Sequence, residues 1–333
     1  MQAAIYGLAG ALPSADERAF FRDADPAGYI LFRRNCVDRA QLRVLTDALR
    51  ALSGREDLPI LIDQEGGRVA RLGQPEWPAF PAGARFAELY AKAPMSAIEA
   101  ARANAQAIAL VLGEMGVNVD CLPVLDLRQE GSSDIIGDRA LGSEPMQVAA
   151  LGRAMLDGLA AGGAVGVVKH MPGHGRARVD SHKELPVVDA PEEALATDLE
   201  PFHTLRNAPM GMVAHIVFTA WDRDNPSSLS PFVIGDIVRG RIGFDGFLMT
   251  DDLGMDALSG SFAERTERAL AAGCDAALHC SGAMEEMVAV ASAAGLLSDK
   301  GRERLARAMA WAGQGTGSYE ALVEKRDKLL ALA

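Results

Sequence analysis

Eight short and nearly continuous apolar segments, separated by longer stretches with helical character, constrain the fold of this chain most. The segments are rich in Val, Ile and Leu, and most of them begin after a Gly or a Pro. This pattern is typical of strands that are buried on both faces of a parallel sheet. The segments are residues 3–8, 28–32, 59–63, 117–126, 165–170, 212–218, 247–250 and 272–279.

The stretches between these segments predict helices. In the clearest of them, residues 98–115, apolar side chains recur at alternating steps of three and four. Ser14 and Glu17 have the spacing of a capping box, which predicts the start of a helix. The other helices are expected at 39–52, 145–161, 192–205, 231–241, 263–272, 284–297, 302–312 and 319–333.

Eight strands that alternate with helices predict a (β/α)8 TIM barrel. A doubly wound open sheet would show the same alternation, and counting segments does not separate the two. The 333 residues are enough for one barrel or for two ordinary domains. Because no break in composition marks a second domain, we expect a single domain over residues 1–333, with the last helix, at about 319–333, packed on its outside.

The charge and the cysteines narrow the class of protein further. A formal net charge of -12 argues against partners that are polyanions, such as nucleic acid or an anionic membrane. No stretch has the length and hydropathy of a membrane span, and the N-terminus lacks the basic region of a signal peptide. None of the four cysteines has metal-type spacing, and Cys121 and Cys274 lie in apolar segments. We therefore expect a cytoplasmic monomer with reduced cysteines.

Polar side chains gather where the predicted strands end, which is where barrel enzymes place their reacting groups. The densest group follows the fifth segment, in the stretch from Lys169 to Gly175 and the Asp-Ser-His sequence at 180–182. Acids end three other segments, and one histidine lies within the sixth. These further residues are Asp63, Asp126, Asp251, Asp252 and His215.

Three blocks of sequence resemble glycoside hydrolase family 3, in the branch of the β-N-acetylglucosaminidases of bacterial peptidoglycan recycling. They are Lys-His-Met-Pro-Gly-His-Gly at 169–175 with Asp-Ser-His at 180–182, Asp-Gln-Glu-Gly-Gly-Arg-Val-Ala-Arg at 63–71, and Met-Thr-Asp-Asp-Leu-Gly-Met at 249–255. Weaker matches lie at 28–35 and 136–139. The blocks follow the family's order, and the resemblance favours the barrel over the open sheet.

The resemblance implies a retaining mechanism in which Asp251 is the nucleophile. Asp252 is the alternative, and because successive strand residues point to opposite sides, only one of the two should face the site. The acid/base implied by the resemblance is His182, paired with Asp180 as a dyad. Histidine titrates near neutral pH, so one imidazole can donate a proton and later accept one.

The same resemblance implies that five polar residues bind the sugar and that neither a metal nor another cofactor is needed. These residues are Asp63, Arg71, Arg139, Lys169 and His170. Arg68 belongs to the same block, but we expect it to tie its loop to the barrel. The implied substrate is N-acetylglucosamine that is β-linked to 1,6-anhydro-N-acetylmuramic acid, with or without peptide, and the implied activity is that of an exo-acting β-N-acetylhexosaminidase.

Two other functions stay open at this point. In a zinc-dependent barrel hydrolase, His170 and His174 could bind a metal together with His182, His215 and Asp251, although Pro172 and Gly173 disfavour the helix that their spacing would need. The chain could also be a sugar-binding barrel without activity. The complete set of Asp180, His182 and Asp251 argues against that reading.

Overall fold

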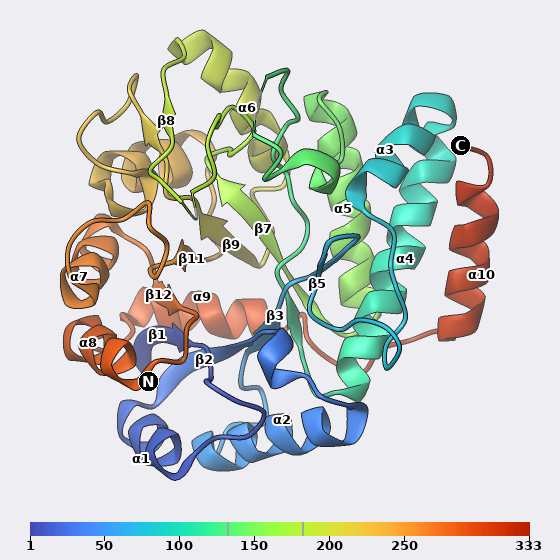
Figure 1. Ribbon diagram of the computed structural model, residues 1–333. Helices are drawn as coiled ribbons and strands as arrows, with labels where there is room; N and C mark the ends of the chain where they lie inside the picture. The colour runs from blue at the N-terminus through green and yellow to red at the C-terminus, as the bar shows by residue number, and fades with distance from the viewer. Residues whose placement is uncertain (132, 182) are drawn as a thin grey trace.

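A closed barrel of eight parallel strands forms the centre of the molecule (Figure 1). The computed structural model describes residues 1–131, 133–181 and 183–333. The prediction of a TIM barrel, rather than an open sheet, is confirmed. In order around the barrel, the strands are β1 (Gln2–Tyr6), β12 (Ala276–His279), β11 (Phe247–Asp252), β9 (Met210–Val213), β7 (Val165–Met171), β6 (Val119–Asp120), β3 (Ile60–Ile62) and β2 (Pro26–Leu31).

Helices surround the barrel, and most of them lie where the sequence predicts them. The capping box of Ser14 and Glu17 starts the first helix, as expected. The helices are α1 (Ala15–Ala24), α2 (Arg39–Ser53), α3 (Gly83–Lys92), α4 (Pro94–Glu114), α5 (Pro145–Ala161), α6 (Glu192–Thr204), a π-helix (Val233–Arg241), α7 (Phe262–Ala272), α8 (Met284–Ala294), α9 (Asp299–Met309) and α10 (Tyr319–Leu330).

Some of the predicted segments differ from the structure in their details. The sixth segment divides into β9 and a separate short strand, β10 (Val217–Phe218), which pairs with β8 (Val187–Val188) outside the barrel. The eighth segment begins too early, because α7 continues to Ala272 and ends at Gly273, whose φ is +113°. The sequence pattern also did not predict α3, which directly precedes α4.

Alternate strand residues point into the barrel and fill it with apolar side chains. Val165 and Val167 of β7 and Phe247 and Met249 of β11 belong to this interior cluster. Lys169 and Asp251 stand two residues further along these strands and lie at the mouth of the barrel, above the apolar interior.

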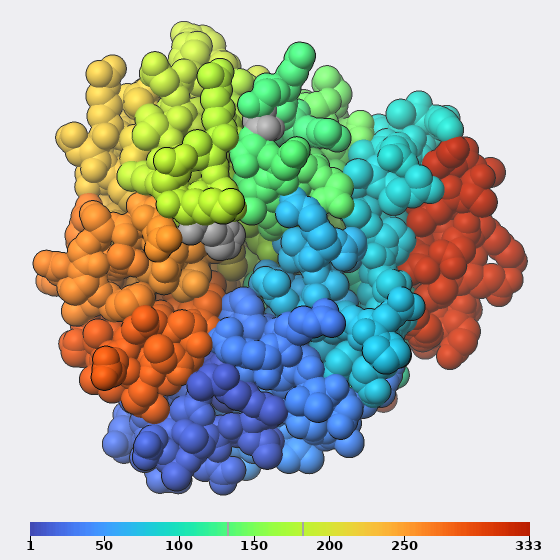
Figure 2. All heavy atoms as spheres, viewed as in Figure 1, coloured from blue at the N-terminus to red at the C-terminus, as the bar shows by residue number. Residues whose placement is uncertain are grey.

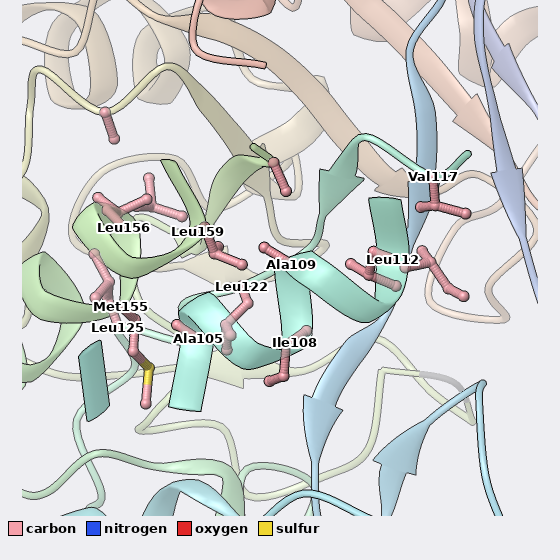
Figure 3. Packing of buried hydrophobic residues seen from close by; sticks show 14 of the residues in the cluster. Ala105, Ile108, Ala109, Leu112, Val117, Leu122, Leu125, Met155, Leu156 and Leu159 are labelled. Atoms are coloured by element: carbon pink, nitrogen blue, oxygen red, sulfur yellow. The ribbon is translucent and has the colours of Figure 1, made fainter. Parts of the chain in front are cut away.

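The outer helices pack closely on the barrel and on one another, above all α4 against α5. Figure 3 shows the apolar side chains that meet at this contact, including Ala105, Ile108 and Ala109 of α4 and Leu156 and Leu159 of α5. A Cβ added at Gly158 would lie 2.3 Å from the carbonyl oxygen of Arg102. Small residues at the contact, such as Gly158 and Ala105, thus permit a short distance between α4 and α5.

The last helix, α10, packs against α4 on the side away from the barrel (Figure 1). Its Arg326 is buried, donates to Oδ1 of Asn104 over 3.1 Å, and lies 5.9 Å from the ring centre of Phe80. Within the described residues, no helix combines the length and the apolar character needed to cross a membrane.

Candidate active site

A cavity of about 240 Å³ lies at the carboxyl ends of the barrel strands. Ile30, Met212 and Leu278, which belong to the apolar interior, form part of its lining. In Figure 2, the light blue, yellow-green and orange segments that follow β3, β7 and β11 meet near the middle of the visible face. The charged and polar side chains that line the cavity are Asp63, Glu65, Arg68, Arg71, Arg139, Lys169, His170, Asp251 and Asp252.

A buried network of ion pairs forms one wall of the cavity. The Nζ atom of Lys169 lies 2.9 Å from Oδ1 of Asp63 and 2.6 Å from Oε1 of Glu65. Arg71 donates to Oδ2 of Asp63 over 2.8 Å, and Arg139 donates to both carboxylate oxygens of Glu65 at 2.8 Å each. Since Lys169 is only 2% exposed, its charge depends on these two acids.

The network keeps its five members ionised at neutral pH. Burial alone would raise the pKa of Asp63, but Lys169 and Arg71 hold it below its usual range. Burial would also raise the pKa of Glu65, whereas Lys169 and Arg139 lower it to about 2. Burial alone would lower the pKa of Lys169, but the carboxylates of Asp63 and Glu65 have the larger effect and raise this pKa. The wall therefore offers fixed donors and acceptors that need no proton exchange to bind a polar ligand.

His170 is held by the fully buried Asp126, whose Oδ2 lies 2.6 Å from Nδ1 of the imidazole. The other oxygen of Asp126 accepts from the main-chain N–H of His174 over 2.6 Å. Because a carboxylate only accepts, Nδ1 carries a hydrogen, and Nε2 lies 3.5 Å from NH2 of Arg139. Asp126 thus fixes both the orientation of His170 and the start of the loop that follows β7.

Asp251 and Asp252 both line the cavity, so the expectation that only one of them faces it is wrong. The register between β11 and β12 shifts between Met249 and Asp252, and this irregularity interrupts the alternation of side chains. The two carboxylates nevertheless differ in their contacts. Oδ1 of Asp252 accepts from the N–H groups of Gly254 and Cys280 at 2.9 and 3.1 Å, whereas Oδ1 of Asp251 accepts from the N–H of Asp252 at 2.9 Å.

The loop after β7 carries the two residues of the expected acid/base dyad. Asp180 is partly exposed and does not line the cavity, and its main-chain oxygen accepts from Lys183 and Glu184 at 2.9 and 3.1 Å. His182 lies outside the described residues. The neighbouring Ser181 is buried, and its main-chain oxygen accepts from the N–H of Ala257 over 3.3 Å. This contact places the loop beside the segment that follows β11.

Six of the eight site residues predicted from the sequence line one cavity in the structure. They are Asp63, Arg71, Arg139, Lys169, His170 and Asp251. Two acids that contact these residues received no role from the sequence, Glu65 and Asp126. Glu65 stands two residues after Asp63, in a block that resembles family 3, and Asp126 ends a predicted strand. The sequence therefore indicates that both acids lie near the site, but it does not indicate which side chains they contact.

Arg68 ties two loops together rather than a loop to the barrel. It donates to Oδ1 of Asp138 over 2.8 Å and to the carbonyl oxygens of Asp134 and Ile135 at 2.6 and 2.7 Å. It stands in the turn between β4 (Gln64–Gly66) and β5 (Val69–Ala70), a small antiparallel ribbon after β3. The contacts fix this ribbon above the cavity.

Two of the histidines that a zinc site would need are engaged in other contacts. His170 is paired with Asp126, and His215 bonds to Ser228 and to a main-chain carbonyl. Across residues 1–131, 133–181 and 183–333, no three side chains of His, Cys, Asp or Glu come together as a possible metal site.

Comparison with known proteins agrees with this geometry. Residues 5–309 match the model of the glycosyl hydrolase family 3 N terminal domain. A β-hexosaminidase of Bordetella avium is 37% identical over 278 residues, which cover 82% of this chain and 79% of the relative. Another, from Alkalilimnicola ehrlichii, is 39% identical over 281 residues, or 83% and 80% of the two chains.

Among solved structures, NagZ from Neisseria gonorrhoeae in complex with N-trifluoroacetyl-D-glucosamine superposes with a TM-score of 0.87 at 29% identity, covering 100% of this chain and 98% of that one. A complex of the same protein with a zinc ion gives 0.87 at 28% identity, with the same coverage. The chain therefore belongs to glycosyl hydrolase family 3 and is one of its β-N-acetylhexosaminidases.

Proposed function

We propose that this β-N-acetylhexosaminidase is a retaining exo-β-N-acetylglucosaminidase that forms its glycosyl-enzyme intermediate on Asp251. The contrast between the two neighbouring acids carries the proposal. Both acids line the cavity, but the carboxylate of Asp252 accepts two main-chain N–H groups and so serves as an anchor between the ends of β11 and β12, while Asp251 stands directly after the buried part of β11. A nucleophile needs this combination of a fixed backbone and access to the substrate.

The buried network supplies the binding site for one sugar ring. The carboxylate of Asp63 can accept from sugar hydroxyls, Lys169 and Arg139 can donate to ring substituents, and Nε2 of a neutral His170 can accept from a hydroxyl. A cavity of about 240 Å³ is smaller than the usual ligand pocket of about 300–1,000 Å³, which suits a single terminal residue and hence exo action. The similar NagZ of Neisseria gonorrhoeae forms a complex with an N-acylated glucosamine, and this supports an acetamido sugar as the substrate here.

The reaction then runs in two steps. The carboxylate of Asp251 attacks the anomeric carbon as the glycosidic bond breaks, and His182 gives its proton to the departing oxygen. In the second step, His182 takes a proton from water, the water oxygen attacks the same carbon, and Asp251 is released as a carboxylate. Asp180 stabilises the charged imidazole before the first step and after the second, and the ring is neutral while the intermediate exists. The main-chain contact between Ser181 and Ala257, at 3.3 Å, supports this arrangement because it holds the loop of the dyad beside the nucleophile strand.

The substrate that we propose is N-acetylglucosamine linked to 1,6-anhydro-N-acetylmuramic acid, with or without peptide, in peptidoglycan recycling. The similarity to NagZ supports this choice. We further propose that the enzyme works as a cytoplasmic monomer without a cofactor, and a net charge of -12 is consistent with a small-molecule substrate rather than nucleic acid.

Two measurements test the proposal. The purified protein should hydrolyse an aryl β-N-acetylglucosaminide and the natural disaccharide, while the matched aryl β-glucoside should react far more slowly. Proton NMR during the first minutes should show the β-anomer of N-acetylglucosamine before mutarotation. If the α-anomer appears first, the enzyme inverts and the intermediate on Asp251 does not exist.

A further inference from the structure

A buried histidine lies behind the proposed nucleophile and outside the cavity. His215 follows β9 and is 0% exposed. Its Nδ1 lies 2.6 Å from Oγ of Ser228, and its Nε2 lies 2.9 Å from the main-chain oxygen of Asp252. Neither the binding of the sugar nor the acid/base step described above uses this residue.

The partners of His215 determine which nitrogen carries the hydrogen. A carbonyl oxygen only accepts, so Nε2 must donate to Asp252. In the neutral ring Nδ1 is then an acceptor, and the hydroxyl of Ser228 donates to it. Burial lowers the pKa of His215, which favours this neutral form. The carbonyl of Asp252 thus selects the tautomer, and the hydroxyl of Ser228 stabilises it by donating to Nδ1.

The main chain of Asp252 connects this histidine to the nucleophile. Its N–H donates to Oδ1 of Asp251 over 2.9 Å, and its carbonyl oxygen accepts from His215. The side chain of Asp252 is bonded to Gly254 and Cys280. Those two contacts come from residues that follow β11 and β12, so His215 adds support from the β9 side of the barrel.

We propose that His215, held by Ser228, is a positioning residue that fixes the carboxylate of Asp251 through the main chain of Asp252. The inference rests on the proposed role of Asp251 as the nucleophile. Since a shift of about 1 Å in a reacting group can cost about 100-fold in rate, loss of this support should slow the chemical step. Binding of the sugar should hardly change, because the groups proposed to hold it come from other parts of the barrel, on or after β3, β5, β6 and β7.

Two substitutions separate positioning from a general effect on stability. The amide nitrogen of Gln can take the place of Nε2 and donate to the carbonyl of Asp252. The side chain of Asn is shorter, so its amide can take the place of Nδ1 but does not reach the carbonyl of Asp252. We expect His215→Asn to lower kcat by about 10- to 100-fold with KM changed less than about threefold. His215→Gln should be at least about tenfold faster than His215→Asn, even though both lose part of the native contacts.

The controls measure folding and ground-state binding. Ile237→Val, at a fully buried position of the neighbouring π-helix, should lower the melting temperature without lowering kcat. The dissociation constant of N-acetylglucosamine should be the same in both His215 variants and in the wild type. Equal losses of kcat in the Asn and Gln variants, or losses that follow the melting temperature, would overturn the inference.

The proposed function has its own separate test. If a fluorinated substrate labels a residue other than Asp251 in the wild type, the assignment of the nucleophile fails, whatever the His215 variants do. If Asp251 is labelled but the Asn variant is labelled as fast as the wild type, only the role of His215 is refuted.

Discussion

Replacing Glu65 with Gln should destabilise the folded protein by about 3 kcal/mol at pH 7. Glu65 is 7% exposed and neutralises two cations, the buried Lys169 at 2.6 Å and the largely buried Arg139 through two bonds of 2.8 Å. Removing one partner of a buried ion pair typically costs about 3–5 kcal/mol. The pKa of Glu65 gives a similar figure, because its fall from 4.5 to about 2 corresponds to about 3 kcal/mol at about 1.4 kcal/mol per pH unit.

The contribution of Glu65 to the free energy of unfolding should decrease as the pH falls. Since the pKa of Glu65 is lower in the folded protein than in the unfolded chain, its contribution is present above about pH 4.5 and is lost as the pH falls toward 2. The difference in unfolding free energy between wild type and Glu65→Gln should therefore shrink from about 3 kcal/mol at pH 7 to about half of that at pH 3.

Urea unfolding followed by circular dichroism measures this difference at both pH values. Glu88→Gln is the matched control, because Glu88 pairs with Arg85 at 2.6 Å while both side chains are about half exposed, and such pairs contribute about 0.5 kcal/mol. If Glu65→Gln destabilised the protein no more than Glu88→Gln, or by the same amount at pH 7 and pH 3, the buried network would not be charged as described.

The remaining predictions concern the chemistry. His182→Ala should lower turnover of the natural disaccharide by about 10²–10⁴-fold, and its defect in forming the intermediate should shrink with a dinitrophenyl aglycone, which leaves without a proton; an equal defect with all aglycones would remove His182 from this role. Asp180→Asn should show the same dependence on the aglycone, since its proposed effect acts through His182. EDTA should leave the activity unchanged, whereas inactivation by EDTA with recovery on adding zinc would favour a metal-dependent hydrolase.

The fold could be predicted from the sequence because each barrel strand is buried on both faces and therefore appears as a continuous apolar segment. The pattern failed where main-chain details decide the structure. The irregular register at the end of β11 brings Asp252 as well as Asp251 to the cavity, although a regular strand would separate them. The end of α7 at Gly273 likewise depends on a left-handed backbone that the apolar pattern does not show.

The candidate site could be predicted in part, because its residues stand at strand ends and in blocks that resemble family 3. The partners of these residues could not, since ion pairs across the barrel join positions far apart in the chain. Lys169 contacts Asp63, which stands 106 positions earlier in the chain, and His215 reaches the main chain of Asp252. Such contacts require the closed barrel, which a linear pattern does not describe.

Trapping of the intermediate tests the central claim most directly. A 5-fluoro glycosyl fluoride derived from N-acetylglucosamine reacts through a good leaving group, while its ring fluorine slows hydrolysis of the intermediate that forms. After proteolysis, mass spectrometry should find one labelled peptide, with the sugar on Asp251. A label on Asp252 or on any other residue, or full turnover by Asp251→Ala, would contradict the account.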